Sequence, residues 1–429
     1  MKQTKYIISV LVIVLAFTSA CTDKVFETFM ANEPVYLSYE DLRSAVKMTV
    51  AREMNNPGKI YFKDQYIFIN EKMKGVHVYD VSNPANPQNK GFIEIPGNVD
   101  IAIKENILYA DSYIDLVSID ISSFASIKET GRVKKIFPYT LPTYDTKYPL
   151  AKLDEAKGVV TGWEVKSVRQ ELEQRYYPIY YRGLNAEKMD MASYSSGGVN
   201  GASGTTFGVG GSMARFGLYL DFLYIVNQNN LLTFKLNSNS EVTLLNTEYV
   251  NWNVETIFIT DKHLFLGTQN GMIVKSLEVP ERPSHKGSFS HMTACDPVVI
   301  KGDLAFVTLK GGNTCRGTLN QLDVIKMSNG YSQFQLLKSY PMYGPQGLGI
   351  DDDLLFICDG DAGLKIYNAA DPLAITQNLV KSFPSINAYD VIPMNNYLFL
   401  IGEKGFMLYD YSNIQDIKQI GIIPVVKKA

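Results

Sequence analysis

The chain carries nearly the same phrase twice, 330 residues apart: GVHVYDVSNPANPQ at 75–88 and GFMLYDYSNIQDIK at 405–418. Each phrase is an alternating apolar run that ends in Tyr-Asp, followed by a Ser-Asn turn and a short polar return. Alternation with period two is typical of a β-strand, and Ser, Asn and Asp are typical turn residues. We interpret the phrase as one strand with its following turn, used as a repeating unit.

Related phrases bring the number of copies to seven. Their last strand residues are Asp80, Asp120, Lys235, Ser276, Lys326, Asn368 and Asp410. The intervals between these residues are 40, 115, 41, 50, 42 and 42, so only the second is far from a common period. Two strand-like runs precede each copy and a fourth follows it. Four short strands repeated about every 40 residues predict an all-β fold, a seven-bladed β-propeller of four-stranded blades.

The phrase VYDVSNPANP and its relatives resemble the LVIVD repeat of extracytoplasmic bacterial proteins. The whole chain resembles the LVIVD-repeat β-propeller lipoproteins of Bacteroidetes over about residues 33–426. The segments CDPVVIKGDLAFVTL, CRGTLNQLDVI and GGSMARF carry much of this likeness. The resemblance implies export, a lipid anchor and a propeller, but it implies no reaction and no catalytic residue.

The N-terminus has the pattern of an export signal. Lys2 and Lys5 precede an apolar run at 6–17 that is short for a membrane span, and TSAC follows, ending at Cys21. This site resembles the looser lipobox of Bacteroidetes, with Thr18 in place of the usual Leu. It predicts diacylation of Cys21 and a place in the cell envelope, by resemblance the outer membrane. A plain cleaved signal and an uncleaved anchor remain open.

The composition excludes one class of partner. The 429 residues are 46% hydrophobic, which is enough for a large core, and 41 basic against 44 acidic residues give a net charge of only −3. No basic field exists to attract phosphates, so we expect no nucleic-acid partner.

The long interval predicts an insertion of about 74 residues at 139–212, between the second and third blades. It ends in the low-complexity stretch SYSSGGVNGASGTTFGVGGS, which predicts a flexible linker, while a degenerate eighth blade remains open. Aromatic side chains in such a loop are good binding contacts, so we predict a ligand-binding surface. Its residues are Tyr139, Tyr144, Tyr148, Trp163, Tyr176, Tyr177, Tyr180 and Tyr181. The alternative is that these rings pack the insertion onto the propeller.

These boundaries divide the chain into four parts. They are a signal peptide (1–20), a lipidated Cys with an N-terminal linker (21–56), the propeller (57–426) and the insertion within it (139–212). The segment SAVKMTV at 44–50 is predicted to add a strand to the last blade and so close the ring. The alternative is closure by side-chain packing between the first and last blades.

Motifs for catalysis and metal binding are weak. GVGGS lacks the Gly-Lys-Ser/Thr of a phosphate loop, and CDGDAG (358–363) and IDDD (350–353) fit β-turns better than a calcium site. The four histidines have no zinc spacing, and no Gly-x-Ser-x-Gly elbow occurs. We therefore expect no metal and no cofactor. Paired carboxylates from distant blades remain possible, since spacing along the chain would not show them.

The cysteines fit an exported protein. Cys295 and Cys315 bracket two predicted strands, and in an oxidising compartment we expect them to form a disulfide. Cys358 lies in the apolar run LLFICD, so we expect a buried thiol rather than a nucleophile.

Two hypotheses for function remain. The first is a lipid-anchored, non-catalytic binding or scaffolding module, whose partners are the membrane, through its lipid, and a protein, peptide or glycan. The second is an envelope enzyme that acts on glycans or peptides at the mouth of the propeller channel. The lack of a recognisable catalytic motif favours the first.

Overall fold

The computed structural model describes residues 26–171, 209–210, 214–238, 240–250, 253–260, 262–268, 270–290, 297–311 and 319–426. These residues belong to two compact units. The first contains residues 26–37 and 141–171, and the second contains residues 38–140 together with the described residues from 209 onward. No helix within the described ranges is long and apolar enough to cross a membrane.

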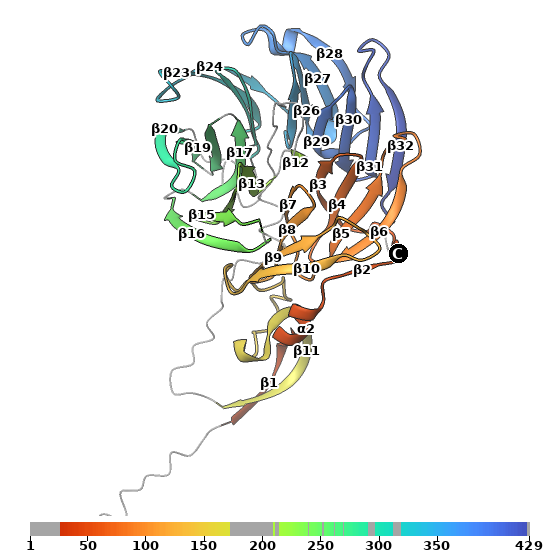
Figure 1. Cartoon of the computed structure of the whole chain (residues 1–429), viewed down its shortest axis with the longest axis vertical. Coiled ribbons are helices and arrows are strands. Elements are labelled where there is room, and N and C mark those ends of the chain that lie inside the picture. Colours follow the sequence, from red (N-terminus) through yellow and green to blue (C-terminus); the bar gives the residue numbers. More distant parts are fainter. Residues whose placement is uncertain are drawn as a thin grey trace, which may run out of the picture. The chain divides into compact units, whose positions relative to one another are not determined.

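The second unit is a seven-bladed β-propeller, as predicted (Figure 1). Each blade is an antiparallel sheet of four strands that follow one another along the chain. The first strands are β3 (Pro57–Lys63), β7 (Ile101–Lys104), β13 (Phe216–Tyr219), β17 (Val254–Thr260), β21 (Val298–Lys301), β25 (Leu348–Asp351) and β29 (Ala388–Met394). The second strands are β4 (Tyr66–Glu71), β8 (Ile107–Ser112), β14 (Phe222–Asn227), β18 (His263–Thr268), β22 (Leu304–Leu309), β26 (Leu354–Cys358) and β30 (Tyr397–Gly402).

The repeated phrase forms the third strand of every blade. The third strands are β5 (Gly75–Asp80), β9 (Asp115–Asp120), β15 (Asn230–Leu236), β19 (Gly271–Ser276), β23 (Gln321–Ser328), β27 (Leu364–Asn368) and β31 (Gly405–Asp410). The fourth strands are β6 (Gln88–Glu94), β10 (Lys128–Val133), β16 (Val242–Tyr249), β20 (Ser284–Ser290), β24 (Gln333–Pro341), β28 (Leu379–Phe383) and β32 (Lys418–Pro424). In all seven blades the pairing of the third and fourth strands contains a register shift.

A buried aromatic ring occupies the third position of every second strand. These rings are Phe68, Tyr109, Tyr224, Phe265, Phe306, Phe356 and Phe399. Large rings bury much apolar area. At this position they belong to clusters of buried side chains that extend from one blade to the next. The core of the ring is therefore a repeated layer between blades.

Two short strands extend the first blade beyond its four. β2 (Lys47–Thr49) pairs with β6 at the outer edge, and β12 (Val209–Gly210) pairs with β3 at the inner edge. The prediction that residues 44–50 add a strand to the last blade is therefore wrong. The last blade already has four strands of its own, and residues 47–49 instead pair with residues 92–94 of β6.

The ring closes mainly by packing between the first and last blades. Phe62 and Phe399 lie with ring centroids 5.2 Å apart, within a cluster of apolar side chains from both blades. One parallel bridge joins Met54 to Val425, and the Val426 N–H donates to the Met54 carbonyl at 2.8 Å. The helix α2 (Tyr39–Ser44) precedes β2 and is capped by Ser38, whose hydroxyl accepts from the Asp41 N–H.

The first unit is a long two-stranded ribbon. β1 (Phe26–Leu37) pairs antiparallel with β11 (Val159–Glu171), so part of the predicted N-terminal linker forms a sheet with the insertion. The buried Asn32 amide donates to the carbonyls of Asp145 and Tyr148, at 2.9 and 2.8 Å. These bonds attach the chain around residues 145–151 to the ribbon. The insertion lies between the second and third blades, as predicted.

Candidate functional site

The connections at one end of the propeller form its candidate functional face. In each blade the chain enters the first strand and leaves the second strand at this end, so the fourth-to-first connections and the second-to-third turns lie together. A cavity of about 580 Å³ opens here, within the usual range for ligand sites. We call it the mouth cavity; its lining comes from blades 5, 6, 7 and 1. Polar members of the lining are Asn55, Asn56, Lys72, Lys310, Tyr343, Gln346, Asp361, Asn387, Tyr389 and Glu403.

The mouth cavity contains one half-buried cation, Lys310, to which no described residue bonds directly. Lys310 follows β22 and is half-buried, and among the described residues it forms no hydrogen bond or ion pair. Burial lowers its pKa, and the nearby Asp361 carboxylate partly offsets that effect. Asp361 itself accepts from the Asn387 amide at 3.0 Å. A partly desolvated ammonium beside polar groups can bind an anionic or hydroxylated ligand group by donating hydrogen bonds to it.

Carboxylates at the ends of second strands hold the loops of this face. Glu71 accepts from the backbone N–H groups of Asn55 and Asn56, and Asp359 accepts from those of Tyr343 and Gly344, all within 3.1 Å. Both carboxylates are buried. Such charge-assisted bonds fix the backbone of the loops, so the mouth cavity has preformed walls.

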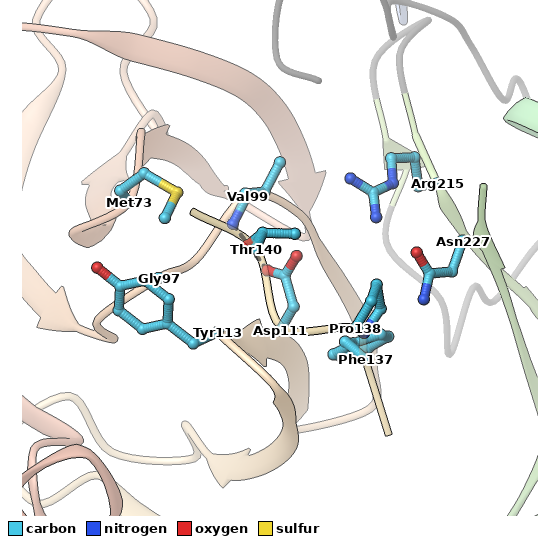
Figure 2. A pocket seen from close by; sticks show the side chains of 10 residues that line it. All are labelled: Met73, Gly97, Val99, Asp111, Tyr113, Phe137, Pro138, Thr140, Arg215 and Asn227. Carbon is cyan, nitrogen blue, oxygen red and sulfur yellow. Dashed lines mark hydrogen bonds between the residues drawn. The ribbon is translucent and has the colours of Figure 1, made fainter. Parts of the chain in front are cut away.

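A second, smaller cavity lies at the same end of blades 1, 2 and 3 (Figure 2). We call it the Arg215 pocket; its volume is about 40 Å³, room for about three waters. Its lining consists of Met73, Gly97, Val99, Asp111, Tyr113, Phe137, Pro138, Thr140, Arg215 and Asn227. The lining therefore combines polar groups with apolar side chains, and Figure 2 shows Phe137 near Asn227 and Met73 apart from it, near Tyr113.

Buried charges surround the Arg215 pocket. The Lys59 ammonium pairs with the Asp100 carboxylate at 2.8 Å, and the Arg215 backbone N–H also donates to Asp100. Asp111 accepts from the N–H groups of Val99 and Asp100 through Oδ1, at 2.7 and 3.0 Å. Burial raises the pKa of Asp111 to about 6, although the positive charge of Arg215 opposes the shift.

The residues predicted from the sequence lie elsewhere. Tyr144 and Trp163 pack edge-to-face in the ribbon unit with centroids 5.9 Å apart, and the Trp163 indole donates to the Pro142 carbonyl at 3.0 Å. Tyr148 belongs to the same unit, whereas Tyr139 belongs to the propeller unit. All four side chains are partly buried. Ligand binding by these residues stays a prediction.

Other predicted residues lie outside the described part of the chain. They are Cys21, Tyr176, Tyr177, Tyr180, Tyr181, Cys295 and Cys315. The lipid anchor and the disulfide therefore stay predictions. Cys358 is fully buried, as expected, and burial raises the pKa of its thiol. Within the described ranges, no three His, Cys, Asp or Glu side chains gather as metal ligands.

Sequence reasoning missed the residues of both cavities. Lys310 and Arg215 are single cations without a motif, and most residues that line the cavities with them come from other blades. One signal was available: a charged residue stands directly before a large apolar residue near the start of several first strands, as in Lys59, Asp100 and Arg215. Aligning the seven units would have placed these three residues at one end of adjacent blades.

Comparison with known proteins identifies the fold. No protein-family model matches the chain, and no curated protein matches it. Among solved structures, the periplasmic gluconolactonase of Pseudomonas aeruginosa is 9% identical, with a TM-score of 0.52 over 86% of this chain and 96% of that one. A Lactobacillus plantarum protein is 11% identical, with a TM-score of 0.51 over 86% and 97%. Sqt1 of Saccharomyces cerevisiae is 9% identical, with a TM-score of 0.50 over 92% and 89%. At these identities the likeness shows the fold alone, that of a β-propeller.

Proposed function

We propose that this chain is a lipid-anchored protein of the cell envelope whose propeller binds a polar ligand in the mouth cavity without catalysing a reaction. The observation that carries the proposal is the mouth cavity itself, about 580 Å³, with ten polar residues in its lining and with Lys310, which forms no hydrogen bond or ion pair with a described residue. Its loops are held by buried carboxylates, so little ordering would be needed on binding. A glycan or a peptide of the envelope has the hydroxyl, amide and charged groups that such a lining would recognise.

The ligand is tested by affinity capture from the organism's own envelope, using the lipidated protein. We expect one component to be captured in stoichiometric amount, and Lys310→Glu to reduce its capture about tenfold by reversing the charge inside the cavity. Lys128→Glu is the matched control, because Lys128 is an exposed lysine on the outer strand β10. Equal capture by both variants would contradict a site in the mouth cavity.

The anchor is tested at Cys21. A diacylated thiol holds a protein to a membrane, so we expect Cys21→Ala to release the protein from the membrane fraction or to stall its signal processing. Mass spectrometry of the mature wild-type protein should show the two acyl chains. An unmodified Cys21 in those spectra would refute the anchor.

An envelope enzyme is the second candidate. Asp111 favours it, because a buried carboxyl with a pKa of about 6 can transfer protons near neutral pH. If this candidate is correct, the protein cleaves envelope glycans or peptides and Asp111→Asn abolishes the cleavage. If the wild-type protein cleaves neither envelope glycans nor envelope peptides, the enzyme hypothesis is rejected.

A further inference from the structure

The guanidinium of Arg215 is largely buried and forms no salt bridge with a described carboxylate, although its charge acts on Asp111 from a greater distance. Arg215 is 9% exposed, and its only side-chain bond within the described residues is a long one, from Nε to the Val226 carbonyl at 3.5 Å. No carboxylate among those residues lies within 4.0 Å of it. Its terminal nitrogens are not among the fully buried atoms that lack a partner, so their N–H donors reach the pocket and can bond to a ligand there.

The nearby carboxylates are engaged elsewhere. Asp100 is bonded to the Lys59 ammonium and to the backbone N–H of Arg215. Asp111 receives all its hydrogen bonds through Oδ1, including one from the Asn98 amide at 2.9 Å. Its Oδ2 has no bond to a described residue, and Figure 2 shows this carboxyl group, Arg215 and Asn227 around the same small space.

Asn227 adds a further free polar group. It is 6% exposed and lines the pocket, and its side-chain amide forms no hydrogen bond to the described residues. Two terminal guanidinium nitrogens and one amide thus provide donors toward one cavity. Two parallel N–H donors from one guanidinium match the two oxygens of a carboxylate.

We propose that the Arg215 pocket binds the carboxylate end group of a small organic acid, with Arg215 as its counter-ion, Asn227 as a further donor and Phe137 against its carbon atoms. This site is separate from the mouth cavity, and it does not depend on the function proposed above.

The size of the pocket limits what enters it. About 40 Å³ is room for a carboxyl group with the carbon that carries it, and a larger acid would extend from the open side of the pocket. Both a sugar acid and the C-terminus of a peptide present this group, so the remainder of either ligand would stay outside the pocket.

The charges that face Asp111 predict how binding varies with pH. They are Arg215, Asp100 and Lys59, and Tyr113 is the other titratable group in the lining. An ionised Asp111 repels a second carboxylate beside Arg215, whereas a neutral Asp111 does not. Because the pKa of Asp111 is about 6, we expect binding to weaken about tenfold between pH 5.5 and pH 7.5.

Titration with acetate, followed by NMR, tests the proposal on the full mature chain. Glucuronate and the dipeptide Ala-Ala distinguish the two sources of the carboxylate, and acetamide is the uncharged control. We expect saturable binding of acetate and of at least one larger acid, and none of acetamide. Arg215→Gln should abolish this binding, while Lys128→Gln should leave it unchanged.

Asp111→Asn keeps the test decisive even if Arg215→Gln does not fold. Its amide retains an oxygen for the backbone donors but has no charge, so we expect tight acetate binding that no longer varies between pH 5.5 and 7.5. Three results would each overturn the proposal: no saturable binding by the folded wild type, equal binding of acetamide, or an unchanged pH dependence in Asp111→Asn.

Discussion

At the scale of single residues, one side-chain oxygen explains why the phrase repeats. The last residue of the third strand accepts the backbone N–H two residues later in five blades: through the Ser276 hydroxyl in one, at 3.2 Å, and through an Asp or Asn oxygen in four, at 2.8 to 2.9 Å. The four Asp and Asn acceptors are Asp80, Asp120, Asn368 and Asp410. Asp and Asn are suited to this turn because their side chains are short enough to reach that N–H. The repeat therefore preserves a strand and the turn that ends it.

The turn can be tested at Asp410. Asp410→Ala removes the acceptor for the Ser412 N–H, so we expect the free energy of unfolding to fall by about 1 kcal/mol in urea titrations. Asp410→Asn keeps an oxygen at the same place and should recover most of the loss. If Asn is as destabilising as Ala, the charge rather than the turn is what matters.

Asp111 should make stability depend on pH. Its folded pKa, about 6, lies above the ordinary value of 3.8, so the folded state holds the proton more tightly than the unfolded state. The contribution of this group is fully present below about pH 4 and is lost as pH rises to about 6. We expect Asp111→Asn to raise the free energy of unfolding by about 2 kcal/mol at pH 7 and by little at pH 4. Urea unfolding at both values checks this; an equal change at both would refute it.

At the scale of elements, glycine is required where the third strand begins close to the fourth. Gly405 has φ of 117°, and a Cβ there would lie 2.1 Å from the Ile423 carbonyl oxygen. We expect Gly405→Ala to lower the free energy of unfolding by about 3 kcal/mol, measured in urea. Gly302→Ala is the control, because its φ is 59° but nothing lies within 4 Å; it should cost about 1 kcal/mol. Similar losses at both positions would show that crowding is unimportant.

The elements differ in how far the sequence predicts them. Third strands were predictable because alternation and an Asp or Asn turn are both local signals. The pairing of β1 with β11 was not, since its partners are about 130 residues apart and both strands leave many side chains exposed. The Arg215 pocket was not predictable either, because Asp111 and Arg215 come from different blades and neither belongs to a motif.

At the scale of the whole molecule, closure by packing makes a distinct prediction. Phe399 packs on Phe62 across the junction of the last and first blades, so Phe399→Ala should lower the free energy of unfolding by about 3 to 5 kcal/mol. Ending the chain at Pro424 removes the bonds that Val425 and Val426 make to Lys404 and Met54, and should cost only about 1 to 2 kcal/mol.

Amide hydrogen exchange in the variants should show which blades of the ring separate first. In Phe399→Ala we expect protection to fall first in β3, β4, β30 and β31, because these strands contribute the side chains that meet at the junction. Phe306→Ala is the matched control, since Phe306 holds the same strand position in the fifth blade and packs in a cluster away from the junction. It should lower protection in blades 4 to 6 instead. If the truncated chain loses as much stability as Phe399→Ala, the bridge between Met54 and Val425 closes the ring, and the packing of the first blade on the last is secondary.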